Sequence, residues 1–128
     1  MRVEEMAPEV HDRILARMSH LPHVLAFSAI NAVVEAEGKM GRELLPYAGS
    51  AFTDLTRVAA SPVEMWRDIF LANRSAVLAA VAEFQKVADR LRELIATGDG
   101  EGLTQELTRA REARLRLTRM REEQRKQG

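Results

Sequence analysis

The sequence predicts an all-α protein, and three observations support this fold class. Alanine, leucine, arginine and glutamate, all strong helix formers, dominate the 128 residues. Aromatic residues make up only 5% of the chain, which argues against a β-sandwich or barrel. Apolar residues recur at spacings of three and four over long stretches, as in amphipathic helices. We expect a single domain over residues 1–128, with an ordered core at about 8–118.

Composition and charge exclude several classes of function. Lysine plus arginine and aspartate plus glutamate number 19 each, so no net field recruits nucleic acid or an anionic membrane. The chain has no cysteine, which excludes disulfides and thiolate metal sites. The longest apolar run, Val24–Val34, is too short to span a bilayer, and the N-terminus lacks the apolar segment of a secretory signal. We therefore expect a cytoplasmic protein.

The first long helix is predicted to run from about Pro8 to Glu37. Proline suits the first turn of a helix, where its missing amide proton has no partner anyway. Gly38 and Gly41 are expected to end the helix. Its apolar positions are wide enough to suggest burial on more than one side: Ile14, Leu15, Met18, Leu21, Val24, Leu25, Ser28, Ala29, Ala32 and Val33.

All three histidines lie in one stretch of this helix, His11–His23. His20 and His23 are three residues apart and share a helix face. Pro22 between them must bend the helix, because its ring clashes with the carbonyl of Met18. Two imidazoles beside a kink form a candidate site, although half-buried histidines that bond locally are the alternative. We expect no metal, since no carboxylate pair accompanies the histidines at the spacing of a di-iron motif.

The middle of the chain is predicted to consist of short elements. Leu44–Tyr47 is a link, and the small residues of Ala48–Ala51 permit close approach of a backbone or ligand. Phe52–Ala60 forms one or two helical turns, in which Asp54 and Arg57 face the same way. Considered alone, these two residues would be an ordinary surface ion pair.

A third helix is predicted to start at Ser61–Glu64. Serine would cap the helix, proline would take the first position, and glutamate would lie three residues after the cap. Trp66 lies on the apolar side of this helix and, alone, would be a core anchor. Asn73 is expected to cap the next helix.

The C-terminal third is predicted to form two helices separated by Gly98–Gly100. The last helix has Leu103, Leu107 and Ala110 facing inward and frays after Met120. Its arginines are interpreted as a solvated helix end rather than a nucleic-acid patch. The helix before it carries an apolar seam that requires a second helix as partner: Val77, Val81, Phe84, Ala88, Leu91 and Ile95.

Three segments, in order, resemble the C-terminal helical domain of the prephenate dehydrogenases. The first is His11-Asp12 followed by Ser19–His23. The second is Ala48–Phe52 with the Asp-x-Thr-Arg element Asp54–Arg57, and the third is Met65–Asn73. The resemblance extends from about Val3 to at least Arg114.

The resemblance implies a dimerisation domain whose long helices interleave between two subunits of a homodimer. The family oxidatively decarboxylates prephenate to 4-hydroxyphenylpyruvate with NAD or NADP, which an N-terminal Rossmann domain binds. This sequence has no Gly-rich phosphate loop and no counterpart of that domain's catalytic histidine. We therefore expect an excised domain, with a natural stand-alone fragment as the alternative, that binds no cofactor and is inactive alone.

The resemblance also implies roles for individual residues. His20, His23 and Arg57 would contact the substrate, with Arg57 forming a bidentate pair with a prephenate carboxylate. His20 and Ser50 would contact L-tyrosine where it acts as an inhibitor. Thr53 departs from the family, in which this position is often basic, and this could weaken attraction for a dianion. Asp12, Asp54 and Trp66 would lie behind the contact residues or at the entrance, an aspartate near Arg57 fixing its guanidinium.

A second hypothesis belongs to another class of function. In it the chain is a non-enzymatic helical interaction module that uses its arginine-rich C-terminal helix on acidic partners. The hypotheses differ in the importance of Arg57, which would be neutral for every ligand if the second were correct.

Overall fold

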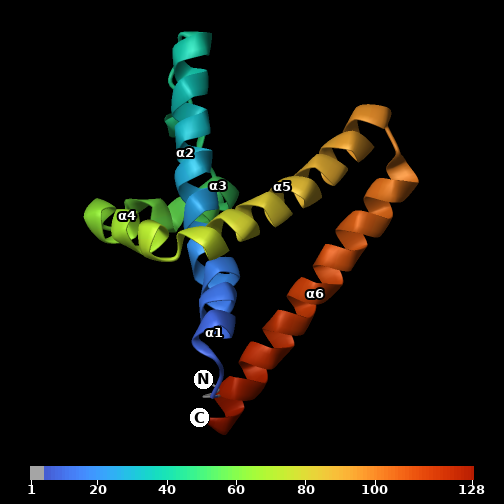
Figure 1. Cartoon of the computed structure of the whole chain (residues 1–128). Helices are drawn as coiled ribbons and strands as arrows, with labels where there is room; N and C mark the ends of the chain where they lie inside the picture. The colour runs from blue at the N-terminus through green and yellow to red at the C-terminus, as the bar shows by residue number, and fades with distance from the viewer. Residues whose placement is uncertain (1–4) are drawn as a thin grey trace. The chain divides into compact units, whose positions relative to one another are not determined.

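The computed structural model describes residues 5–128, and in this range it is helical with no strand, which confirms the all-α fold. Residues 1–4, including Val3 where the family resemblance begins, lie outside the described residues. The elements, in chain order and as labelled in Figure 1, are α1 (Pro8–Leu15), the π-helical turn η1 (Ala16–His20), α2 (Leu21–Met40), the 3₁₀ turn η2 (Leu45–Tyr47), α3 (Ser50–Thr56), the 3₁₀ turn η3 (Arg57–Ala60), α4 (Val63–Ala72), α5 (Arg74–Thr97) and α6 (Gly100–Gln127).

The chain divides into two compact units, which are described separately. We call Met6–Ala82 the histidine unit, because it contains all three histidines. We call Glu83–Gly128 the hairpin unit, because it contains the turn between α5 and α6.

The first helix begins at Pro8 as predicted, but it is interrupted by a π-helical turn directly before Pro22. Within this turn the amide of Leu21 donates to the carbonyl of Ala16, five residues earlier. Pro22 cannot donate the α-helical hydrogen bond to Met18. The irregularity that the sequence predicted at the proline therefore takes the form of a widened turn on its N-terminal side.

The helix ends at Met40, where Gly41 adopts the left-handed conformation (φ 62°). Glu37 secures the segment that follows, because its Oε2 atom accepts hydrogen bonds from the amides of Leu44 (2.7 Å) and Leu45 (3.2 Å). The predicted link is thus fixed by a carboxylate in the last turns of α2.

The predicted serine cap of the next helix is wrong. The Ser61 hydroxyl donates back to the carbonyl of Val58 (2.6 Å) and closes η3, and α4 begins at Val63 with no side-chain cap. Asn73 does precede α5 and accepts a hydrogen bond from the amide of Val77 through its carbonyl, but its side chain bonds elsewhere. The Ser61 hydroxyl and the Asn73 side-chain nitrogen thus both donate hydrogen bonds to backbone carbonyls outside the helix that each was predicted to cap.

The core of the histidine unit joins the first helix to the start of α5. Ala16, Val77 and Ala80 are buried together, so the two backbones approach closely. The expectation that Met18 lies on a buried face is wrong for the single chain, because its side chain is 73% exposed. Partly buried apolar side chains around the core are Leu21, Val24, Phe70, Ala76 and Val81.

The hairpin unit turns at Gly98, which is left-handed (φ 67°), and Asp99. The Asp99 carboxylate accepts a hydrogen bond from the amide of Gly102 (2.8 Å) and caps α6. Helix α6 continues to Gln127, past Met120 where fraying was predicted.

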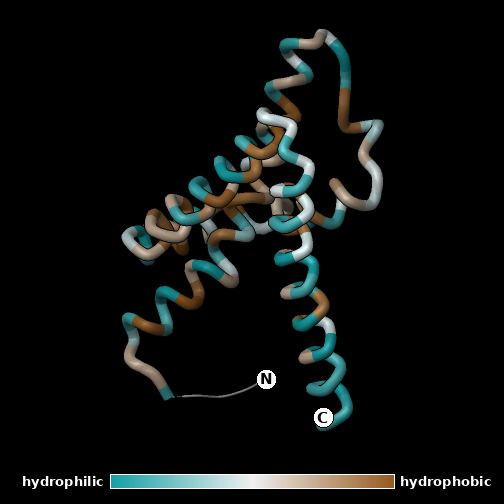
Figure 2. Tube along the Cα trace, turned by 90° about the vertical axis from the view of Figure 1, so that its right-hand side faces the viewer, coloured by the Kyte–Doolittle hydropathy of each residue, from teal (hydrophilic) through white to brown (hydrophobic). Residues whose placement is uncertain are grey.

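Glu106 links the two helices of the hairpin unit, because it pairs with Arg90 of α5 (2.9 Å) and with Arg109 of α6 (2.8 Å). Beyond this pair the side chains of α6 are exposed, and most are hydrophilic (Figure 2). Leu107 is 56% exposed and Ala110 is also exposed, which contradicts their predicted inward position within the chain. Of the three predicted inward positions, only Leu103 is partly buried in the described chain.

Candidate functional site

His20 and His23 meet on one indole ring, that of Trp66 in α4. The His23 ring stacks on it, with 3.4 Å between ring centroids and 14° between planes. The His20 ring meets it edge-on, at 6.0 Å and 79°. Trp66 is only 7% exposed and also contacts Phe70, with 5.6 Å between centroids. The structure thus brings together the two histidines that share a helix face and the tryptophan of the third recognised segment.

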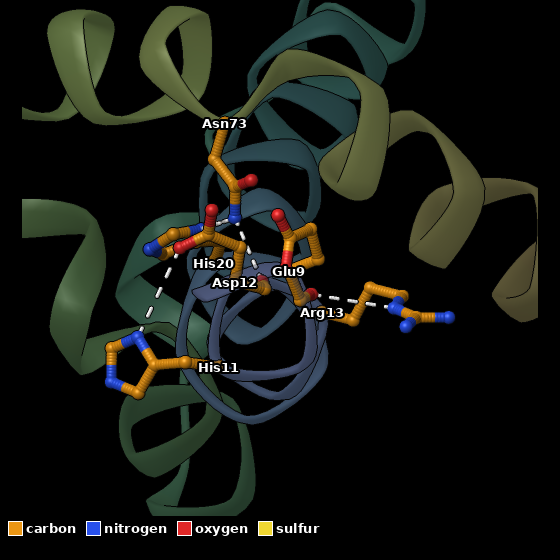
Figure 3. Close-up of polar contacts among 6 residues, drawn as sticks. All are labelled: Glu9, His11, Asp12, Arg13, His20 and Asn73. Atoms are coloured by element: carbon orange, nitrogen blue, oxygen red, sulfur yellow. Dashed lines mark hydrogen bonds and ion pairs between the residues drawn. The ribbon is translucent and has the colours of Figure 1, made fainter. Parts of the chain in front are cut away.

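Hydrogen bonds fix both imidazole rings. The Nδ1 atom of His23 lies 2.8 Å from the carbonyl oxygen of Ser19. The Nδ1 atom of His20 lies 3.4 Å from the side-chain amide nitrogen of Asn73, which also donates to the backbone carbonyl of Asp12 at 2.9 Å. Figure 3 shows the Asn73 amide directed toward both partners.

The environment of His20 favours its neutral form. Its side chain is buried, and burial is the main cause that lowers its pKa from the ordinary value of 6.5. The positive charge of a protonated His23 acts in the same direction, whereas the Asp12 carboxylate opposes the shift. His20 is therefore suited to act as an uncharged hydrogen-bonding group.

His11 and Asp12 lie at the exposed end of this cluster. Their side chains face each other at 3.9 Å between Nδ1 and Oδ1, and both are more than half exposed (Figure 3). Asp12 contributes to the site mainly through its backbone carbonyl, which holds Asn73. Among the described residues, the ring contacts of Trp66 include His20 and His23 but not His11, which joins the site through this surface pair.

Arg57 lies at the first residue of η3, a turn that packs against α2, the helix carrying His23. Its side chain is exposed, as are those of Asp54, Ser50 and Thr53. Among the described residues no ion pair joins Asp54 to Arg57, although Arg57 follows α3 directly as the first residue of η3. The expected pre-alignment of the guanidinium by Asp54 is therefore absent from this chain alone.

Asn73 and Ser19 belong to the site, although the sequence predicted only a helix cap for Asn73 and no role for the Ser19 carbonyl. Asn73 is 61 residues from Asp12 in sequence, so no helical spacing could connect them. The Ser19 carbonyl lies one turn before His23, as the carbonyl four residues earlier does in any α-helix, so its position gave no special signal. The only signal was their position within the recognised segments.

Two features that residues 5–128 lack bear on other functions. No three histidine, aspartate or glutamate side chains there converge in a group able to hold a metal ion. No helix in the same range has the length and apolar character needed to cross a membrane.

Comparison with known proteins identifies the fold. The family described as "Prephenate dehydrogenase, dimerization domain" matches residues 7–109. The chain belongs to this family. The match covers α1 to α5 and the first turns of α6, and thus every site residue described above.

Relatives in this family are longer than the chain. Cyclohexadienyl dehydrogenase of Zymomonas mobilis is 40% identical over 116 residues, which are 91% of this chain and 40% of that protein. Prephenate dehydrogenase of Bacillus subtilis is 35% identical over 77% of this chain and 26% of its own length. The chain thus spans two fifths or less of these relatives.

Solved structures agree with the family assignment. Prephenate dehydrogenase of Aquifex aeolicus, in complex with hydroxyphenyl propionate and NAD⁺, superimposes with a TM-score of 0.83 at 37% identity, over 91% of this chain and 40% of that one. Arogenate dehydrogenase of Synechocystis shares the fold, with a TM-score of 0.76 at 22% identity over 91% of this chain and 42% of that one.

Proposed function

We propose that this chain supplies the substrate-binding side chains and the homodimer interface of an NAD(P)-dependent prephenate or arogenate dehydrogenase. The reaction is the oxidative decarboxylation of prephenate to 4-hydroxyphenylpyruvate. The observation that carries the proposal is the Trp66 cluster, in which two family-motif histidines are held rigidly on one indole. The described residues contain no strand, so the nicotinamide and its Rossmann fold belong to a separate domain.

The two histidines would orient the substrate as hydrogen-bonding groups. Their rings are fixed by Trp66 and by backbone or amide partners, so little side-chain entropy is lost when a ligand binds. Asp12 and Trp66 would support them without touching the substrate. The reason is that the Trp66 ring is buried and the Asp12 carbonyl already accepts a hydrogen bond from Asn73.

Arg57 would bind a carboxylate of the substrate. Its guanidinium is exposed and has no ion-pair partner among the described residues, so a dianion meets no internal competitor. A charge-assisted pair of this kind contributes about 1.5–3 kcal/mol per hydrogen bond. Asp54 would lie at the entrance and would align Arg57 only once a ligand or a second subunit is present.

Regulation by L-tyrosine would use His20 and Ser50. Ser50 is the exposed first residue of α3, preceded by Gly49, and it lies in the small-residue run that permits close approach. A tyrosine that occupied His20 would compete with prephenate for the same hydrogen-bonding group.

The homodimer would cover the apolar positions that the single chain leaves exposed in the hairpin unit. These are large side chains of both helices: Phe84, Val87, Ile95, Leu107, Leu115, Leu117 and Met120. The interleaving of long helices between subunits is part of this proposal.

The test follows the ring signals of the three histidines by proton NMR during titration with prephenate and then tyrosine. We expect saturable shifts of His20 and His23. Arg57→Ala should weaken prephenate binding about 10- to 150-fold, the equivalent of one such hydrogen bond. Arg42→Ala, at another exposed arginine of the same unit, should bind normally.

If neither ligand binds to this chain, the titration would be repeated after a nicotinamide-binding domain has been joined to it. If prephenate still shifts no histidine signal in the complete enzyme, the proposed substrate site is wrong. The hypothesis of a helical interaction module would then be favoured.

A further inference from the structure

Asn73 is anchored between two helices independently of its side chain. Its backbone amide donates to the carbonyl of Ile69 (3.2 Å) at the end of α4, and its carbonyl accepts from the amide of Val77 (3.0 Å) in α5. The side chain therefore starts from a fixed point. It reaches across to the first helix, where Figure 3 shows it above Asp12 and His20.

The carbonyl of Asp12 decides which way the Asn73 amide faces. A carbonyl oxygen only accepts hydrogen bonds, so the atom 2.9 Å from it must be the amide nitrogen and not the amide oxygen. The same nitrogen lies 3.4 Å from Nδ1 of His20. An amide nitrogen only donates, so Nδ1 of His20 must be the acceptor and carries no proton. At this length the bond is weak, but its direction is fixed.

His23 has the opposite arrangement. Its Nδ1 lies 2.8 Å from the carbonyl oxygen of Ser19, which can only accept, so this Nδ1 carries a proton. When both rings are neutral, His20 has its proton on Nε2 and His23 has a free lone pair on Nε2.

We infer that Asn73 is a positioning residue that holds neutral His20 in the tautomer with its proton on Nε2, while the Ser19 carbonyl holds His23 in the opposite tautomer. The Nε2 atom of His20 has no partner among the described residues, yet no buried polar side-chain atom there is unpaired, so this atom reaches solvent. The pair therefore presents one uncharged donor and one acceptor side by side on Trp66.

The consequence for recognition rests on the proposed function. A ligand group that both accepts and donates, such as a hydroxyl, matches the neutral pair. A carboxylate matches it only after His23 takes up a second proton. Burial, the main cause, lowers the pKa of His20 and so favours its neutral donor form; a charged His23 adds to that effect, and the Asp12 carboxylate opposes it.

The test records two-bond proton–nitrogen correlation spectra of the ¹⁵N-labelled full chain above pH 7 without any ligand. Substitution of each histidine assigns the signals. We expect an unprotonated Nδ1 in His20 and a protonated Nδ1 in His23. A protonated Nδ1 in neutral His20 would overturn the inference without any variant of Asn73.

Two variants separate positioning from simple support of the fold. Asn73→Ala should release His20 into a mixture of tautomers, because the donor that faces Nδ1 is lost. Asn73→Asp should move the proton to Nδ1 and raise the pKa of His20, since a carboxylate only accepts. Asn31→Asp, an exposed site in α2, makes the same charge change and should leave His20 as it is. An unchanged His20 in both Asn73 variants would contradict the inference.

The result is independent of the proposed function, because no substrate is added. If the tautomers are as stated but prephenate shifts no signal even in the complete enzyme, the proposed function alone fails. If prephenate binds but neutral His20 is protonated on Nδ1, the positioning role alone fails.

Discussion

The histidine unit and the hairpin unit both have apolar residues at helical spacing, but the side chains compared here differ in how far they are buried. In the histidine unit, Trp66 is covered by two imidazoles and Phe70 and is 7% exposed. In the hairpin unit, Ile95 is 62% and Leu107 56% exposed, although both lie on apolar stripes. An apolar stripe shows that a helix needs a partner, but it does not show whether that partner is in the same chain.

Trp66→Ala would break the more complete of the two units and should have the largest effect. Removal of a buried indole destabilises a protein by about 3–5 kcal/mol. Val63→Ala, on the same helix at a position that is 76% exposed, should change stability by less than about 0.5 kcal/mol. Urea unfolding of the two variants measures the difference, and similar midpoints would mean that Trp66 is not a core residue.

Leu107→Glu would test whether a second subunit completes the hairpin unit. If Leu107 is buried between subunits, the variant should lose about 1.5–3 kcal/mol per protomer and dissociate at micromolar concentration. Thr108→Glu places the same charge at an exposed polar neighbour and should remain dimeric. Light scattering measures the mass, and a wild-type mass equal to one chain would refute the dimer.

Gly102→Ala would test how closely the side chains of Asp99 and Leu94 pack against the start of α6 in the hairpin unit. An added Cβ atom would lie 2.6 Å from Oδ2 of Asp99 and 2.7 Å from Cδ2 of Leu94. The Asp99 cap would have to move, at a cost of about 0.5–2 kcal/mol. Gly100→Ala meets nothing within 4 Å and should be neutral or slightly stabilising. Equal urea midpoints for the two variants would contradict the crowding.

The smallest effect should be a pH dependence confined to the histidine unit. The folded pKa of His20 lies below its ordinary value of 6.5, so the unfolded chain binds a proton that the folded chain does not. Stability is fully present above pH 6.5 and should fall as the pH drops below that value. His20→Gln should flatten this decline and His11→Gln should keep it; an unchanged slope in His20→Gln would exclude His20 as its source.

The sequence predicted the features that depend on local rules. Proline in the first turn of α1, glycine after α2 and α5, and the shared face of His20 and His23 follow from backbone geometry and helical spacing. The family motifs then associated Trp66 with those histidines, although periodicity alone made it only a core residue.

Features that depend on tertiary contacts were not predictable in this way. Ser61 had two available partners, and only the 3₁₀ turn before it decided between them. Asn73 matched a helix cap, in which its side-chain oxygen would accept, but its side-chain nitrogen donates to a carbonyl 61 residues away. Helical spacing allows Asp54 to meet Arg57, but no ion pair joins them in the described residues, so spacing alone does not decide this contact.

Because of the π-helical turn at Ala16–His20, the geometry of the site depends on the number of residues in the first helix. Each residue of an α-helix advances the chain by about 100° around its axis. Loss of one residue from this turn, with a return to regular α-helix, would rotate everything before it by that angle relative to His23. The Asp12 carbonyl would then leave Asn73, although no residue that contacts a ligand had changed. A single-codon deletion here would therefore be more damaging than most substitutions in the same segment.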